Sequence, residues 1–551
     1  MRRLLEPYAA DWRSLCRFYD VPLSCQRLQR LSRFNDAWRQ RLAEVDFAAL
    51  DGDGQVDYLL LRNHLDHERF LLQLQEERRS EVAGLLPALG EITDLEESRR
   101  AMAHPAPELL AQRLSSLADS VEASRRRVGQ VDASGPSRNE CHRAARSLEQ
   151  LLPVFDSWHR HYHDFKPEYR WWTGQPFGRA RKALRRCLKD LRSRARGGAG
   201  EDSPRSLVGD PIGRRALEAA LAHEMLPYGP EDLVRLGERE LAWCTREMER
   251  ASAELGYGTN WRHALNHVKE RHVAVGQQDL LVARLAREAI DFVTTRDLVT
   301  VDDLCRETWY VDMIDEKGQQ TLPYQGYGGQ RLLASYPTAT MDPAAALTSL
   351  RSNNVHFSRA VTHHELIPGH HLQAYVAERS REHRGIFATP FLSEGWCVYW
   401  EMLLWDLGYA RGPEDRVGML FWRMHRCARI VVSLRFHLGE MEPPDMVDYL
   451  IEHVGHEREA AEGEVRRYIS DDYPPLYQCA YLIGALQLRA LRRECVDSGR
   501  MSDRVFHDAV LRENAIPIEL IRSRLLALPL TRDFRPSWLF EESAFGGRHG
   551  D

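Results

Sequence analysis

The stretch that decides the fold reads THHELIPGHHLQAYVAERS at residues 362–380 and continues as FLSEGWCVYWE at residues 391–401. Four histidines and one glutamate fall between His363 and His371. Imidazoles are common protein ligands for zinc, and an adjacent carboxylate can accept a proton from the attacking water. The concentration of these side chains around a Pro-Gly pair predicts a metal centre rather than a cluster of hydrogen-bonded core histidines.

The spacing of the histidines differs from the common HExxH helix. There, two histidines four positions apart lie on one helix face. Here the fourth position after His364 is Pro368, and the next histidine is His370. Because proline removes a helical hydrogen bond, we expect Pro368-Gly369 to kink or bulge the helix and to bring His370 back towards His364. His371 remains an alternative, although seven residues of helix would separate it from His364 by about 10 Å.

The second half of the stretch supplies a carboxylate. A zinc site with two histidines normally adds a carboxylate and leaves one position for water, and Glu394 fits that role. Glu401 lies two turns beyond Glu394 on the same helix face, where it either orients a histidine or is a surface charge. Since histidine and glutamate complete a zinc site, we expect none of the ten cysteines to be a ligand, and Cys397 to lie beside Glu394 only in sequence.

The remaining chain is predicted to be mostly α-helical. Apolar residues recur at three- and four-residue steps over residues 28–50, 59–81 and 107–127, as in amphipathic helices. Pro230 and the two acidic residues after it predict the start of a helix that runs to Arg250. Residues 321–340, TLPYQGYGGQRLLASYPTAT, are rich in glycine and aromatic residues and predict a small β element.

Two segments rich in Gly, Ser and Pro, at residues 131–137 and 194–206, indicate loops or linkers. We divide the chain into an N-terminal helical region, 1–205, and a helical catalytic region, 206–551. We expect the two regions to form one continuous helical body, because one large body best explains a cleft built from residues 325–485.

The composition narrows the class of protein. A chain of 551 residues with 43% hydrophobic and 28% charged residues is an ordinary globular protein, and its net charge of −6 argues against a nucleic-acid binder. The N-terminus lacks the apolar core of a signal peptide, and no window of about 18 uninterrupted apolar residues suggests a membrane span. Scattered cysteines without a CxxC pair fit a reducing compartment. We therefore expect a cytoplasmic protein that binds neither nucleic acid nor membranes.

HELIPGHHLQ followed by EGW-x-x-Y-x-E resembles the bacterial family known as domain of unknown function 885, which is grouped with the gluzincin-type zinc metallopeptidases. The resemblance covers residues 225–530 well. It implies a multi-helical fold with a deep cleft and one zinc ion. It also implies that His364, His370 and Glu394 are the metal ligands and that Glu365 is the general base.

One departure from the family concerns RIVVSLRFHLG at residues 429–439, where Ser433 occupies a position at which many relatives carry Asp. His437 is retained. The departure leaves open an enzyme of the same fold retooled for a non-peptidase reaction on a small molecule. A non-catalytic binding protein on this scaffold is a third hypothesis.

The leading hypothesis is a zinc peptidase or amidase that acts on short peptides or peptide-like molecules. Glu365 would take a proton from the attacking water and pass it to the leaving amine. A further donor is needed for the developing oxyanion, and Tyr481 is the first candidate and His437 the second.

Two further features fit a peptide substrate. The glycine-rich segment around Tyr327 could present backbone groups to an extended peptide. A substrate carboxylate would need an arginine, and the candidates are Arg466, Arg467 and Arg489.

Overall fold

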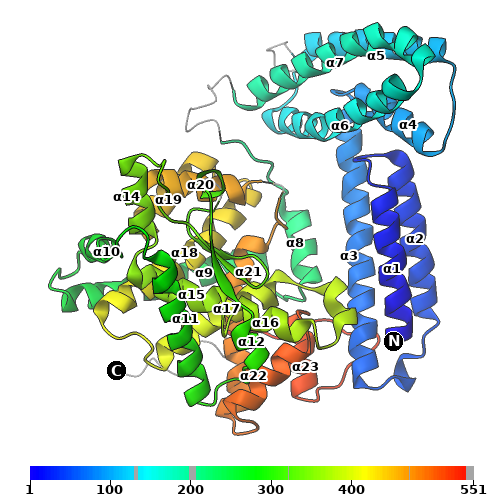
Figure 1. The fold of residues 1–551 in the computed structure, drawn as a ribbon. Helices are drawn as coiled ribbons and strands as arrows, with labels where there is room; N and C mark the ends of the chain where they lie inside the picture. The colour runs from blue at the N-terminus through cyan, green and yellow to red at the C-terminus, as the bar shows by residue number, and fades with distance from the viewer. Residues whose placement is uncertain (129–134, 198–206, 320–321, 471, 542–551) are drawn as a thin grey trace. The chain divides into compact units, whose positions relative to one another are not determined.

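The computed structural model describes residues 1–128, 135–197, 207–319, 322–470 and 472–541. Within these ranges the protein is mostly α-helical with one small three-stranded sheet, as the sequence predicts (Figure 1). Most of the two predicted linkers lies outside the described residues, as does Thr321. Among the described helices, none combines the length and apolar character needed to cross a membrane.

The chain divides into two compact units. One contains residues 1–2, 46–61 and 211–551, and the other contains residues 3–45 and 62–210. From the sequence, residues 46–61 fall within the N-terminal helical region, 1–205. In the structure they belong with the C-terminal part, because Asp57 accepts a hydrogen bond of 2.8 Å from the buried guanidinium of Arg384.

The first 210 residues form long amphipathic helices. Their bounds are α1 (Arg2–Phe18), α2 (Cys25–Ala43), α3 (Gly52–Ala83), α4 (Ala88–Arg100), α5 (Pro107–Val128), α6 (Arg138–Phe165) and α7 (Pro167–Ala195). Leucines spaced by helical turns, such as Leu114, Leu148 and Leu184, are fully buried where α4 to α7 pack together.

The larger unit contains the segment that the sequence singled out. Its helices up to the sheet are α8 (Arg214–His223), α9 (Pro230–Glu254), α10 (Trp261–Lys269), α11 (Gln278–Thr295) and α12 (Asp303–Glu307). Those that follow are α13 (Glu316–Gln319), α14 (Pro343–Ser352), α15 (Val355–Glu365), α16 (His370–Ala377), α17 (Pro390–Asp406), α18 (Pro413–His437), α19 (Pro443–Val454), α20 (Arg458–Tyr468), α21 (Tyr477–Arg492), α22 (Asp503–Arg512) and α23 (Ile518–Leu525).

Helix α18 forms the centre of this unit. It begins with Pro413 at its first position and has Glu414 and Asp415 in its first turn, a favourable arrangement for a helix N-terminus. All side chains from Val417 to Leu434 are buried, because α18 packs against α9, α15, α19 and α21. A helix buried on all faces holds its polar side chains in fixed positions.

The sheet has the order β1-β3-β2, with β1 (Tyr310–Met313) parallel to β3 (Arg331–Ala334) and β2 (Gln325–Tyr327) antiparallel to it. The hairpin β2–β3 lies inside the predicted segment, and positive φ angles at Gly329 and Gln330 form its tight turn. Strand β1 lies before residue 321, outside the predicted bounds. Its pairing is non-local, so periodicity within one short segment does not reveal it.

Candidate metal centre

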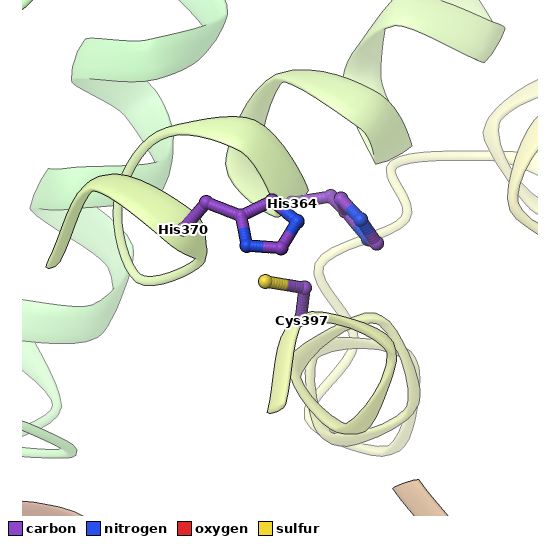
Figure 2. Close-up of side chains that lie close together, drawn as sticks. All are labelled: His364, His370 and Cys397. Carbon is purple, nitrogen blue, oxygen red and sulfur yellow. The ribbon is translucent and has the colours of Figure 1, made fainter. Parts of the chain in front are cut away.

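The helix that carries the first two histidines is interrupted as the sequence predicts. Helix α15 ends at Glu365 and α16 begins at His370. Between them, the Gly369 amide donates to the His363 carbonyl at 3.0 Å. A Cβ atom on Gly369 would lie 1.8 Å from the His364 carbonyl oxygen, so only glycine fits. This break brings the imidazoles of His364 and His370 together, with ring centroids 5.1 Å apart (Figure 2).

Glu394 from α17 completes a cluster of three potential ligand atoms. Its Oε2 lies 3.3 Å from Nε2 of His370 and 3.7 Å from Nε2 of His364. Tetrahedral zinc with bonds of about 2.0–2.2 Å places neighbouring ligand atoms about 3.3–3.6 Å apart. Oε2 is buried and has no hydrogen-bond partner among the described residues. The spacing of these three atoms therefore fits coordination of one metal ion better than hydrogen bonds among the three side chains.

Glu401 contacts His364 at Nδ1, the ring nitrogen that does not face Glu394. Its Oε1 lies 2.6 Å from Nδ1 of His364, and Arg426 lies 3.6 Å from the same oxygen. Burial opposes ionisation of Glu401, but Arg426 and His364 outweigh it and lower its pKa. An ionised Glu401 accepts a hydrogen bond from Nδ1–H of His364, and this contact orients Nε2 towards Glu394. Of the two roles expected for Glu401, the structure favours the orienting one.

Cys397 is closer to the cluster than the sequence analysis expected. Its Sγ lies near the ring nitrogens of His364 and His370, all within 4.8 Å of one another (Figure 2). The expectation that it lies beside Glu394 only in sequence is wrong, since residues three apart share a helix face. Burial raises the pKa of the thiol well above its ordinary value, and the charge of Glu394 raises it further. A neutral thiol is a poor ligand, so Glu394 fits the third position better.

Glu394 is already ionised in this environment. Burial alone would raise the pKa of its carboxyl group, but the imidazoles of His370 and His364 hold that pKa well below its ordinary value. The hydroxyl of Tyr477 also donates a hydrogen bond to Oε1. One oxygen is thus held by Tyr477 while the other faces the histidines.

The Gly-Trp pair after Glu394 fixes the position of α17. A Cβ atom on Gly395 would lie 2.6 Å from backbone atoms of Gly484, so the two glycines allow α17 and α21 to approach closely. The indole Nε1 of Trp396 donates to the Pro368 carbonyl at 2.8 Å. These contacts explain why the three residues occur together. Glu394 belongs to the cluster, Gly395 allows the close packing of α17 and α21, and Trp396 holds the turn between α15 and α16.

The other two histidines of the segment have different surroundings. The ring nitrogens of His371 lie 3.0 Å from the Cys305 carbonyl and 3.4 Å from the Tyr327 hydroxyl, so its ring is held away from the cluster. His363 is fully buried and packs edge-on against Tyr409. Of the alternatives for the second histidine, the structure therefore brings His370, not His371, to His364.

A cavity of about 340 Å³ opens beside the cluster. Its lining includes His364, Glu365, His370 and Glu394, together with Tyr481. The Tyr481 ring stacks on the His364 ring with centroids 6.3 Å apart and an angle of 13°. Burial raises the pKa of Glu365 above its ordinary value. The predicted base and the first predicted oxyanion donor therefore both lie on this cavity.

Sequence reasoning missed Tyr477, which also lines the cavity. The Tyr481 hydroxyl lies 3.5 Å from the Tyr477 hydroxyl, and both residues are on α21. Their spacing of four residues places them on one helix face, and that spacing was the available signal.

His437, the second predicted oxyanion donor, does not line the cavity. It ends α18, where its carbonyl accepts a hydrogen bond from Gly213 at 3.0 Å. It lies eight residues beyond Arg429, the last cavity-lining residue of α18, and a helix advances about 12 Å over that length. The prediction for His437 is corrected. Ser433 also lies outside the cavity lining, so the departure from the family pattern does not alter the wall.

The fold and the site define a large helical protein with two histidines and a glutamate converging beside a cavity. The chain belongs to the family described as "Bacterial protein of unknown function (DUF885)", whose model matches residues 19–525. The family expected from the motifs is confirmed, and the match reaches further towards the N-terminus than the motifs indicated. No curated protein matched the chain.

Two solved structures share the fold. One is a "putative lipoprotein of unknown function" from Shewanella oneidensis, with a TM-score of 0.70 and 18% identity, covering 95% of this chain and 99% of that one. The other is a "putative lipoprotein" from Colwellia psychrerythraea, with a TM-score of 0.61 and 16% identity, covering 95% of this chain and 98% of that one.

These two descriptions correct the expected location. Both proteins of matching fold are described as putative lipoproteins, so the cytoplasmic assignment is not retained. Scattered free cysteines were a weak basis for it, because burial protects thiols in any compartment: eight of the ten are buried.

Proposed function

We propose that this protein is a metal-dependent hydrolase, a zinc peptidase or amidase of the gluzincin type that acts on short peptides or peptide-like molecules. The observation that carries the proposal is that Nε2 of His364 and Nε2 of His370 both lie within 3.7 Å of Oε2 of Glu394. Two histidines and a carboxylate, with one side open to a cavity, form the ligand set of many catalytic zinc sites.

A zinc ion held by these residues would supply Lewis acidity for an amide carbonyl and for the attacking water. Glu365 on the cavity wall accepts the proton of that water and delivers it to the leaving amine. Its raised pKa, a consequence of burial, makes it a stronger base than an exposed glutamate. The hydrolysis then needs a hydrogen-bond donor for the negative charge that develops on the carbonyl oxygen.

Tyr481 is the candidate for that donor. The Tyr477 hydroxyl proton is already used in the hydrogen bond to Glu394, whereas Tyr481 donates only at 3.5 Å, to the Tyr477 oxygen. Burial raises the pKa of Tyr481, so its hydroxyl keeps its proton at neutral pH. A weakly engaged, protonated hydroxyl can turn to a developing oxyanion without losing a strong hydrogen bond.

The position of strand β2 favours a substrate that binds in an extended conformation. This strand is an edge strand of the sheet, and Gln325, Gly326 and Tyr327 line the cavity. Tyr324 and Gly328 hydrogen-bond to β3, so by alternation the backbone groups of Gln325 and Tyr327 point to the open edge. An open strand edge binds an extended peptide through main-chain hydrogen bonds.

The experiment that tests the proposal measures metal content and hydrolysis together. Purified protein is loaded with zinc and assayed on a library of free and blocked short peptides, with and without a chelator. Glu365→Gln is expected to retain one zinc ion and to lower kcat/KM by about 10²–10⁴-fold, and the exposed Glu378→Gln is the matched control. Undiminished hydrolysis by zinc-loaded Glu365→Gln, or no zinc in the wild type, would overturn the proposal.

A further inference from the structure

The residues that line the cavity include three arginines, Arg426, Arg429 and Arg467. The side chains of Arg426 and Arg429 are almost completely buried. Buried charges are costly unless an opposite charge lies close to them, so each of these arginines needs an ionic partner.

Two of the three arginines have such a partner. Arg426 lies 3.6 Å from Glu401, and Arg467 lies 3.7 Å from Glu464. The Glu464 carboxylate is ionised, because the charges of Arg467 and Arg429 outweigh burial and lower its pKa to about 2. Glu464 also lies 3.7 Å from His425, whose pKa burial holds well below its ordinary value, so this histidine adds no positive charge.

Arg429 is different. Its Nε donates to the side-chain oxygen of Gln478 at 2.9 Å, and a second guanidinium nitrogen donates to the same oxygen. The guanidinium lies over the Tyr481 ring at 4.0 Å and the Tyr468 ring at 5.3 Å. In the described ranges, no carboxylate oxygen lies within the 4.0 Å of an ion pair with it. Arg429 is thus a buried cation with a neutral amide and two aromatic rings as its immediate partners.

Polar atoms of the other two arginines are also unsatisfied. The Nε atoms of Arg426 and Arg467 are buried and have no hydrogen-bond partner in the described parts of the chain. These arginines bring three guanidinium groups and two partner carboxylates, whereas Glu365 and Glu394 line the same cavity beside the histidines. An anion with two oxygens would satisfy donors that the protein itself leaves unpaired.

We infer that Arg429 and Arg467 form a binding site for a carboxylate group of the substrate. The inference rests on the proposed function, because it places this carboxylate in the same cavity as the candidate metal centre. Tyr481 contacts both: its ring stacks with that of His364, and the Arg429 guanidinium lies over it. The His364–Tyr481 distance of 6.3 Å and the Tyr481–Arg429 distance of 4.0 Å together set an upper limit on the separation of the carboxylate site and the metal cluster. That limit is about the length of three extended residues.

This arrangement selects short substrates that carry a free carboxylate. A peptide bound through its C-terminal carboxylate would place one of its last peptide bonds beside the cluster, which is exopeptidase action. An acidic side chain could supply the same group from within a peptide. Of the three arginines predicted from sequence, Arg467 lines the cavity, whereas Arg466 is exposed and Arg489 pairs with Asp406 at 2.9 Å.

The test measures binding to the full-length, metal-free protein, so it does not depend on hydrolysis. Calorimetry compares acetyl-leucine, acetyl-leucinamide and acetyl-aspartic acid α-amide, after dialysis to remove any polycarboxylate chelator. Wild type is expected to bind acetyl-leucine at least tenfold more tightly than acetyl-leucinamide. If the aspartic acid α-amide binds about as tightly as acetyl-leucine, the carboxylate is that of an acidic side chain. If it binds weakly, the carboxylate is that of the substrate's C-terminus.

Arg467→Gln is expected to abolish the preference for the acid, and Arg466→Gln, one position away and exposed, to retain it. Because Arg429 is buried, Arg429→Lys keeps the charge and is checked by thermal unfolding; it is expected to weaken the preference while the protein stays folded. Equal binding of acid and amide by wild type, or an intact preference in Arg467→Gln, would overturn the inference. If zinc-loaded protein hydrolyses free and C-terminally amidated peptides equally, and none of these peptides has an acidic side chain, the proposed function stands and this inference fails. If the protein prefers the acid but hydrolyses no peptide, this inference stands and the proposed function fails.

Discussion

The indole nitrogen of Trp396 donates a 2.8 Å hydrogen bond to the carbonyl of Pro368, and this bond joins the two halves of the candidate metal centre. Pro368 lies two residues before His370, and Trp396 lies two residues after Glu394. The bond therefore sets the position of the histidine turn against the helix that carries the carboxylate.

Trp396→Phe removes this donor and leaves a carbonyl unpaired, which costs about 1–3 kcal/mol of unfolding free energy. We expect zinc affinity to fall about tenfold as well, since the turn before His370 loses its anchor. Trp400→Phe is the matched control: Trp400 is equally buried, and its indole nitrogen has no hydrogen-bond partner in the described ranges. Equal effects of the two substitutions on zinc affinity would show that the Trp396 bond has no special role.

Gly395→Ala tests the close contact between α17 and α21. The added methyl would lie 2.6 Å from the Gly484 backbone, so the helices must separate. We expect a loss of stability of about 1–3 kcal/mol and weaker zinc binding, because Glu394 is the adjacent residue. Gly463→Ala in α20 has open space around the new methyl and is expected to be neutral or stabilising. Thermal and urea unfolding measure both variants.

Glu394→Gln and Cys397→Ala distinguish the two possible third ligands. Both side chains lie on one face of α17 near the histidines. We expect Glu394→Gln to lose stoichiometric zinc and Cys397→Ala to keep it, because a buried thiol among carboxylates stays protonated. Elemental analysis after dialysis measures the zinc content. Loss of zinc only in Cys397→Ala would assign the position to sulfur.

Glu401→Gln tests the support behind His364. The carboxylate of Glu401 accepts the 2.6 Å hydrogen bond from Nδ1 of His364, and the neutral amide of glutamine lacks its negative charge. Loss of such a supporting carboxylate typically lowers metal affinity 10–100-fold, and we expect a reduction of this size. Competition with a zinc-binding dye measures it. An unchanged affinity would mean that the orientation of His364 is fixed by packing alone.

The stability of the protein is expected to depend on pH through Glu519. This glutamate is 4% exposed, and burial raises its pKa to about 7 from an unfolded value of 4.5. Between these pH values the folded state retains a proton that the unfolded state has lost, so stability falls as pH rises from 4.5 to 7. Glu519→Gln should therefore stabilise the protein by about 3 kcal/mol at pH 8 and by little below pH 4.5.

The exposed Glu307→Gln provides the control for that pH series. It should leave unfolding free energy unchanged at every pH. A constant difference between Glu519→Gln and wild type from pH 4.5 to 8 would contradict the assignment.

Local pattern was sufficient for much of this structure. Helical periodicity predicted the mostly α fold, and Pro368-Gly369 predicted the break that turns His370 towards His364. Both depend on residues close in sequence, where propensity and backbone geometry dominate. The glycine-rich segment likewise predicted a small β element, because tight turns have strong residue preferences.

Contacts between distant segments were not accessible in the same way. Strand β1, the Tyr477 hydrogen bond to Glu394 and the arginines Arg426 and Arg429 all depend on how separate elements pack. His437 was predicted from its place in a motif-like segment, but the length of α18 carries it past the cavity. Cys397 was set aside on residue type, although helix geometry placed it next to the histidines.

The most direct test of the central claim is the anomalous diffraction of crystals loaded with zinc, measured above and below the zinc edge. The account predicts one strong peak about 2.0–2.2 Å from Nε2 of His364, Nε2 of His370 and a carboxylate oxygen of Glu394. No peak at this position, or a peak that these three side chains do not coordinate, would contradict it.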